Sequence, residues 1–213
     1  LAMIHIWKAL EDAGIAPASL AGSNTAMFIG TMALGYSELL TQSGVAIESY
    51  SATGNCPSVG PNRMSYLLNL HGPSEPVETA CSSSLVALRR GVLAIQHGES
   101  DLAIVGGINT IVTPSVHIAL SKAQMLAKDG RCKTFSDQAN GYTRAEGAGI
   151  LVLKRLSLAE RDGDRILGIV RGTAENHGGR ANSLTAPNPA AQAELLKAAY
   201  RQAGVDPRSI GYI

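Results

Sequence analysis

Short apolar runs alternate with helical patterns along most of the chain, and this alternation restricts the folds that the chain can adopt. The runs lack the every-second-residue polarity of a strand with one face in water. Such runs are typical of strands buried on both faces, which occur in layered α/β proteins. We expect buried strands at residues 25–30, 102–105, 149–153 and 166–170. The predicted fold class is therefore α/β.

Helical patterns fill the segments between these runs. The most regular pattern extends from Ser82 to Gly98 and has its large apolar residues at spacings of three and four, which is typical of one helix face. This stripe consists of Leu85, Leu88, Val92 and Ile95. Residues 75–79, just before it, are expected to be extended, because a residue that precedes proline is disfavoured in a helix. Further helices are predicted up to Gly14 and at residues 62–70, 114–127 and 190–203, whereas residues 36–61 have no clear assignment.

Composition and charge exclude several functional classes. The 213 residues carry 18 basic and 17 acidic side chains, so the chain has no strong positive field of the kind that nucleic acid requires. No apolar run reaches the roughly 18 residues of a membrane span. No basic segment followed by an apolar segment, as in a secretory leader, precedes the opening helix. We therefore expect a cytoplasmic protein without nucleic-acid or membrane partners.

The positions of the cysteines and of two glycines argue against disulfide, zinc and dinucleotide sites. Cys56, Cys81 and Cys132 are odd in number and far apart, which fits neither a disulfide framework nor a zinc pair and favours a reducing compartment. One disulfide between two of them remains an alternative. Gly106 and Gly107 follow a strand but lack the continuation of a dinucleotide-binding motif. Close packing at a strand end explains these two glycines better.

The segment around Cys81 carries the clearest chemical signal. It reads VETACSSS at residues 77–84 and places a cysteine between an extended segment and a helix, among small residues that leave it accessible. Free N–H groups and the macrodipole of a helix N-terminus favour a thiolate, which is the nucleophilic form of cysteine. The same N–H groups can receive the oxyanion of a tetrahedral intermediate. The alternative is a small buried cysteine that packs at a strand end.

This segment resembles the active site of β-ketoacyl synthases, in particular ketosynthase domains of modular type I polyketide synthases. The similarity begins with TACSSSLVA at residues 79–87 and continues in order along the whole chain. Further matching segments are NRMSY at 62–66, GPS at 72–74, DLAIVGG at 101–107, GRCKTF at 130–135, EGAG at 146–149 and LTAPN at 184–188. Several ordered matches over this length are more specific than the cysteine motif alone.

The resemblance implies a thiolase-like layered sandwich built from two similar α/β halves. Residues 1–155 would form the N-terminal half, incomplete at its start, and residues 156–213 would begin the C-terminal half. The opening helix has no N-cap residue in front of it, and a strand-like pattern begins at residues 209–213. We therefore interpret the sequence as a fragment of such a domain.

The resemblance also implies a reaction, a decarboxylative Claisen condensation. In this family the cysteine, here Cys81, takes an acyl chain from the phosphopantetheine arm of an acyl carrier protein, and a malonyl unit on a carrier then extends it. Two histidines of the family, one in an HGTGT segment, would follow after Ile213, so we expect the fragment alone not to condense. The family needs no metal or nucleotide cofactor, and it is homodimeric through the extended segment before the cysteine.

Other residues have less specific roles. Val116 and Leu120 correspond to positions that border the acyl pocket in the family, although ordinary core packing is an equal alternative. The histidines are interpreted as structural or surface residues, because lone histidines rarely mark a site. They are His5, His71, His97, His117 and His177.

Three alternatives to a condensing enzyme stay open. A domain of this family can pass an acyl chain along on Cys81 without extending it. A cysteine hydrolase would need His117 or His177 as the base for Cys81. A purely structural half-domain would have an unreactive Cys81.

Overall fold

The computed structural model describes residues 1–32 and 35–212, and the chain divides into two units, Leu1–Arg155 and Leu156–Ile213. The first unit contains a four-stranded sheet with the strand order β2-β1-β3-β4. These strands are β1 (Ala26–Gly30), β2 (Ser74–Val77), β3 (Leu102–Asn109) and β4 (Gly147–Lys154). The α/β prediction is confirmed.

The first three strands are parallel, and β4 pairs antiparallel with β3. The register pairs Gly30 at the end of β1 with Val77 of β2 on one side and with Gly107 of β3 on the other. The carboxyl ends of the three parallel strands therefore meet at one edge of the sheet. This edge is where ligands usually bind in parallel α/β sheets.

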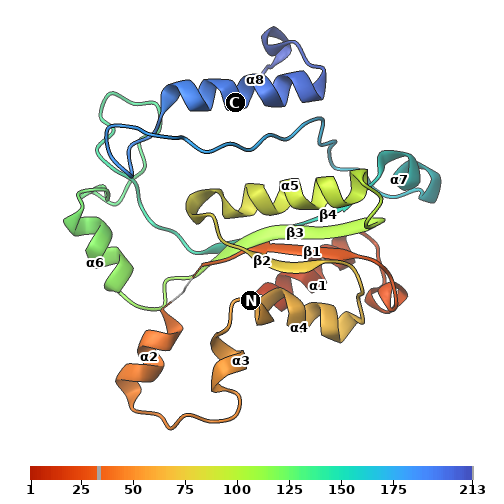
Figure 1. Cartoon of the computed structure of the whole chain (residues 1–213), viewed down its shortest axis with the longest axis horizontal. Coiled ribbons are helices and arrows are strands. Elements are labelled where there is room, and N and C mark those ends of the chain that lie inside the picture. The colour runs from red at the N-terminus through yellow and green to blue at the C-terminus, as the bar shows by residue number, and fades with distance from the viewer. Residues whose placement is uncertain (33–34, 213) are drawn as a thin grey trace. The chain divides into compact units, whose positions relative to one another are not determined.

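Helices cover both faces of this sheet (Figure 1). On one face, α1 (Ala2–Asp12) and α4 (Val59–Leu68) pack against Met27 and Ile29, and on the other α5 (Ser83–Gln96) packs against Ala26 and Phe28. Alternate residues of β1 thus point to opposite layers, as strand geometry requires. All five residues of β1 are buried, which confirms the prediction of a strand buried on both faces.

Helix α5 buries only part of the stripe that its large residues predict, since Ile95 is buried and Leu88 packs, partly buried, against the core. Leu85 is 70% exposed, and the face toward the sheet is made by Val86, Ala87, Ala94, Ile95 and Gly91. The reason is the close approach of α5 to β3, since a Cβ atom on Gly91 would lie 2.4 Å from Cγ1 of Val105. Small residues are needed where backbones pack this tightly, so the buried face is centred on Ala87, Gly91 and Ala94, and Ile95 is the buried member of the predicted stripe.

Several expected element boundaries change. The predicted strand at residues 149–153 is β4, and its side chains alternate in exposure, with Leu151 52% exposed. Strand β3 continues through Gly106 and Gly107 to Asn109 instead of ending at the glycines. The stretch at residues 36–61 holds α2 (Tyr36–Ser43), α3 (Ser51–Asn55) and the start of α4. Helix α6 (Ser115–Lys122) is shorter than the pattern at 114–127 suggested, and η1 spans Pro17–Leu20.

The second unit contains helices α7 (Leu156–Asp162) and α8 (Pro189–Ala203) and the short turn η3 (Pro207–Ser209). The expected strand at 166–170 is wrong, because these residues form no ladder and Leu167 is 73% exposed. The described part of this unit has no strand to pair with them, and a strand needs a partner for its N–H and C=O groups. Residues 210–212 likewise form no strand, and Ile213 lies outside the described residues.

The predicted helix at 190–203 is confirmed as α8, and its ends explain why it was recognisable. The Asn188 side chain accepts hydrogen bonds from the N–H groups of Ala190 and Ala191, and Gly204 ends the helix with a φ of 62°. These are the usual N-cap and C-cap devices. None of the helices in the described ranges is long and apolar enough to cross a membrane.

Candidate active site

Cys81 lies where the sequence suggests, at a junction between a strand and a helix. Strand β2 ends at Val77, the short turn η2 (Ala80–Ser82) contains Cys81, and α5 begins at Ser83. The Cys81 side chain is exposed, so the alternative of a small buried cysteine is wrong. The thiol stands at the N-terminal end of a 14-residue helix, beside the carboxyl edge of the sheet.

Hydrogen bonds within the turn hold the backbone on both sides of Cys81. The Ser83 hydroxyl accepts from the N–H of Thr79 at 2.9 Å and donates to the carbonyl oxygen of Ala80 at 2.7 Å. The Ser82 hydroxyl donates to the Thr79 carbonyl at 2.8 Å. Ala80 has a φ of +53°, a left-handed conformation that is uncommon for a residue with a side chain. The hydrogen bonds of Ser82 and Ser83 therefore help to hold Ala80, the residue before Cys81, in this left-handed conformation.

Two glycines at the carboxyl edge of the sheet allow the start of α5 to approach. A Cβ atom on Gly30 would lie 2.8 Å from the backbone nitrogen of Ser84, and one on Gly107 would lie 2.7 Å from the Cβ of Ser84. Both distances are shorter than side chains tolerate, so the first turn of α5 rests directly on β1 and β3. This packing fixes the position of Cys81, and it agrees with the expectation that Gly107 serves close packing.

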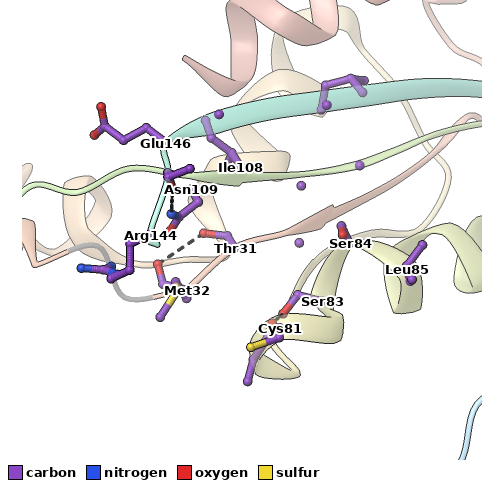
Figure 2. Close-up of a pocket in the computed structure, with 18 of the residues that line it drawn as sticks. Thr31, Met32, Cys81, Ser83, Ser84, Leu85, Ile108, Asn109, Arg144 and Glu146 are labelled. Carbon is purple, nitrogen blue, oxygen red and sulfur yellow. Dashed lines mark hydrogen bonds between the residues drawn. The ribbon is translucent and has the colours of Figure 1, made fainter. Parts of the chain in front are cut away.

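A cavity of about 860 Å³ opens beside Cys81, within the first unit. Figure 2 shows Cys81 and Ser83 at the start of α5 and Leu85 further along the same helix. Both residues predicted to border a pocket, Val116 and Leu120, line this cavity together with Cys81. Other large apolar lining residues are Met32, Leu85, Leu88, Val105, Ile108, Ile150 and Leu151.

Polar residues that the sequence did not single out line another part of the cavity. Asn109, Arg144 and Glu146 lie together there, close to Thr31 (Figure 2). Asn109 donates from Nδ2 to the Ala145 carbonyl at 2.6 Å, which joins the end of β3 to the segment before β4. Arg144 has a buried Nη1 atom without a hydrogen-bond partner among the residues that the structure describes.

Only the fold brings these polar residues together. Thr31 and Asn109 lie at the carboxyl ends of parallel neighbours β1 and β3, where functional side chains of such sheets gather. Their positions directly after, or at the end of, apolar strand-like runs could have indicated in the sequence that Thr31 and Asn109 belong to the site. Arg144 belongs to a loop-rich stretch without periodicity, so nothing in its local sequence indicates that it lines the cavity.

The three cysteines are free, and all are exposed. Cys56 and Cys132 do not line the cavity. The hydroxyl of Ser58, 3.0 Å from Sγ, is the main cause that lowers the pKa of Cys56, and N–H groups at the start of α4 contribute. The Sγ atom of Cys132 accepts from the N–H of Thr143 at 3.2 Å.

None of the five histidines is among the described residues that line this cavity. His177, one of the two bases considered for a hydrolase, accepts at Nδ1 from the N–H of Gly179 at 2.9 Å. The other, His117, belongs to α6, but the cavity lining includes only Val116 and Leu120 of that helix. In the described ranges, His, Cys, Asp and Glu side chains form no group that could hold a metal ion.

Comparison with protein families decides the identity. Residues 1–159 match the N-terminal domain of β-ketoacyl synthases, and residues 167–213 match the C-terminal domain. The chain belongs to the β-ketoacyl synthase family. It is part of a ketosynthase domain of the kind found in type I polyketide synthases. The β-ketoacyl synthase family is a family of acyltransferases.

Curated relatives of this ketosynthase chain are much longer. It is 60% identical to polyketide synthase PksN of Bacillus subtilis over all 213 residues but spans 4% of that protein. It is 48% identical to the 6-methylsalicylic acid synthase of Aspergillus terreus over 97% of its own length, which is 12% of that protein.

Solved ketosynthase structures share the fold. An oxazolomycin ketosynthase domain from Streptomyces albus JA3453 superposes with a TM-score of 0.88 at 40% identity, over 99% of this chain and 37% of that one. The ketosynthase from module 6 of the bacillaene synthase of Bacillus subtilis 168 superposes with a TM-score of 0.90 at 38% identity. The superposition covers 99% of this chain and 36% of that one. The thiolase-like ketosynthase fold is confirmed, with the N-terminal domain and the start of the C-terminal domain present.

Proposed function

We propose that the domain containing this chain catalyses the decarboxylative condensation of an acyl group on Cys81 with a malonyl-type unit in polyketide synthesis. The observation that carries the proposal is the position of Cys81. Its exposed thiol lies at the N-terminal end of α5 and lines the same cavity as Val116 and Leu120. A nucleophile at the edge of an apolar cavity of this size suits an acyl chain as substrate.

The first step is transfer of the acyl chain to the enzyme. The Cys81 thiolate attacks the carbonyl carbon of an acyl thioester on the phosphopantetheine arm of a carrier protein. N–H groups at the start of α5 stabilise the resulting oxyanion, because a helix N-terminus presents donors without intrahelical acceptors. The carbon–sulfur bond to the carrier then breaks, the carrier thiolate leaves and takes up a proton, and the acyl chain remains on Sγ.

The second step forms the new carbon–carbon bond. A malonyl thioester on a carrier protein loses carbon dioxide, and the electron pair of the broken bond forms an enolate. The enolate carbon attacks the carbonyl carbon of the acyl group on Cys81. The bond between that carbon and Sγ breaks, the electron pair returns to the thiolate, and a β-ketoacyl carrier is released. The electrons balance within the two substrates, so no oxidant or reductant is consumed.

The proposed partners follow from these steps. Acyl carrier proteins deliver both substrates on phosphopantetheine arms, and the domain itself uses no metal or nucleotide. We also propose a homodimer formed through the segment before Cys81, since β2 is an outer strand of the described sheet. Sedimentation of the complete domain measures its oligomeric state, and a monomer at micromolar concentration would contradict the homodimer.

The experiment that tests this function uses the complete ketosynthase domain that contains this chain. An acyl carrier protein loaded with an acyl group is supplied first, and malonyl carrier protein second, with intact-protein mass spectrometry after each addition. We expect an acyl adduct on the peptide that contains Cys81, and then loss of the adduct with release of carbon dioxide. An adduct that passes to a carrier without carbon dioxide release would instead establish a transfer-only domain. Absence of any adduct would overturn the proposal.

Leu120 provides a test of the cavity. Replacing it with phenylalanine adds volume to the lining, so acylation by large acyl groups should fall relative to acylation by acetyl. We expect a change in this ratio of roughly ten-fold, as is usual when an apolar pocket changes by a few carbon atoms. Ile118→Phe is the matched control, because Ile118 lies on the same helix, is 50% exposed and does not line the cavity. Equal effects of the two variants would contradict the assignment.

A further inference from the structure

One carboxylate joins helix α2 to the start of helix α6. The Oε1 atom of Glu38 accepts a hydrogen bond from the Ser115 hydroxyl at 2.6 Å, and Oε2 accepts one from the Thr113 hydroxyl at 3.1 Å. Glu38 lies in α2, Thr113 lies just before α6, and Ser115 is the first residue of α6; the two hydroxyls are 75 and 77 residues further along the chain than Glu38. These three residues are called the Glu38 cluster below.

The electrostatics of the Glu38 cluster favour its ionised form. The hydroxyl of Ser115 is the main cause that lowers the pKa of Glu38, followed by the hydroxyl of Thr113, and the side chain of Gln42 contributes from the next turn of α2. Hydrogen bonds to a charged acceptor are stronger and shorter than those between neutral groups. The cluster therefore holds its geometry while the carboxylate is ionised.

Close backbone packing reinforces the same junction. Gly35, the residue that precedes α2, has a φ of +80°, and a Cβ atom there would lie 2.5 Å from Oγ1 of Thr113. Thr113 is 7% exposed, so its side chain is enclosed between the two segments. Glu38 accepts a hydrogen bond from the Thr113 hydroxyl, which this packing buries. The start of α6 is thus fixed against α2 by both packing and hydrogen bonds.

This junction matters because α6 forms part of the cavity beside Cys81. Val116 and Leu120 are one helical turn apart on α6 and both line that cavity. Val116 directly follows Ser115, the residue that donates the shorter bond to Glu38. The first turn of α6 therefore connects the hydrogen bonds of Glu38 to the lining of the cavity.

We infer that Glu38 is a positioning residue that sets the acyl-chain selectivity of Cys81 by fixing α6 through Thr113 and Ser115. The inference rests on the proposed function, in which this cavity receives the acyl chain. Without the carboxylate, the first turn of α6 shifts and the space around Val116 and Leu120 changes. Acyl groups that reach these residues are affected, whereas acetyl, which ends close to Sγ, is not.

The test measures a ratio of rates. The complete ketosynthase domain that contains this chain is incubated with the acetyl or the octanoyl thioester of N-acetylcysteamine, and the rate of adduct formation on Cys81 is followed by mass spectrometry. A loss of folded protein lowers both rates equally and leaves the ratio unchanged. A shift of α6 changes the octanoyl-to-acetyl ratio, so the ratio distinguishes positioning from general stabilisation.

We expect Glu38→Ala to change this ratio by about ten-fold or more, and Glu38→Gln, which keeps the shape and one acceptor oxygen, to change it less. The double variant Thr113→Val, Ser115→Ala should reproduce the effect, and adding Glu38→Ala to it should change little more, because the three residues act together. Glu48→Ala is the matched control, since Glu48 is exposed and lies in the loop after α2.

The outcomes separate the inference from the function on which it depends. If the unaltered domain is acylated on Cys81 and Glu38→Ala leaves the ratio as in Glu48→Ala, the inference is wrong and the proposed function stands. If the unaltered domain forms no adduct with either thioester, the proposed function is wrong, and the inference is lost with it.

Discussion

Replacement of Cys81 with alanine is expected to abolish acylation of the ketosynthase domain while the fold persists. The side chain is exposed and none of the described hydrogen bonds of the turn uses Sγ, so its removal leaves the packing of α5 intact. Loss of a catalytic nucleophile lowers the rate by at least about 10³-fold. The measurement is intact-protein mass spectrometry after incubation with an acyl thioester, with circular dichroism to verify the fold.

The other two cysteines provide matched controls. Cys56 and Cys132 are also free and exposed, but neither lines the cavity. Cys56→Ala and Cys132→Ala should therefore keep the adduct that forms on Cys81. Cys56 is the stricter control, because the Ser58 hydroxyl lowers its pKa, and a lower pKa favours the thiolate form. An adduct that persists in Cys81→Ala and disappears in Cys56→Ala would assign the nucleophile to Cys56.

The second large effect is expected at Gly30, where alanine should destabilise the domain and slow acylation. The added Cβ would lie 2.8 Å from the nitrogen of Ser84 and 2.9 Å from the carbonyl carbon of Ser83. These are backbone atoms that cannot rotate away, so β1 and the start of α5 must separate. Such overpacking costs about 1–3 kcal/mol of unfolding free energy.

The same separation displaces Cys81, which lies in the turn directly before α5. A misplacement of about 1 Å can lower a catalytic rate by up to roughly 10²-fold. Thermal unfolding and the acylation rate of Gly30→Ala therefore measure the two consequences separately.

Gly60→Ala is the control for Gly30→Ala. Gly60 lies in α4, and nothing lies within 4 Å of the position of its Cβ atom. Alanine there should leave acylation unchanged and change helix stability little, because its higher helix propensity is opposed by the clash of its Cβ atom with the following Pro61. If Gly30→Ala unfolds at the same temperature as Gly60→Ala and is acylated as fast, then α5 does not depend on close contact with β1.

Much of the fold could be predicted because its signals are local. The buried run that became β1 and the helix that became α8 were both recognisable, the latter because Asn188 and Gly204 cap it. The errors arose where a partner decides the structure. Residues 166–170 have the composition of a strand, but the described part of the second unit contains no strand with which they could pair. In α5, Ile95 of the predicted stripe is buried but Leu85 is exposed, and Gly91 makes the close approach to the sheet.

In the candidate site, too, some features follow from the local sequence and others only from the tertiary structure. The sequence alone determined that Cys81 stands at the start of a helix, since its extended approach and helical continuation depend on neighbouring residues. Only the tertiary structure decided which side chains share its cavity. Asn109 and Arg144 come from different segments, and Glu38 reaches hydroxyls more than 70 residues away. Such contacts depend on strand order and helix packing, which no local pattern of residues encodes.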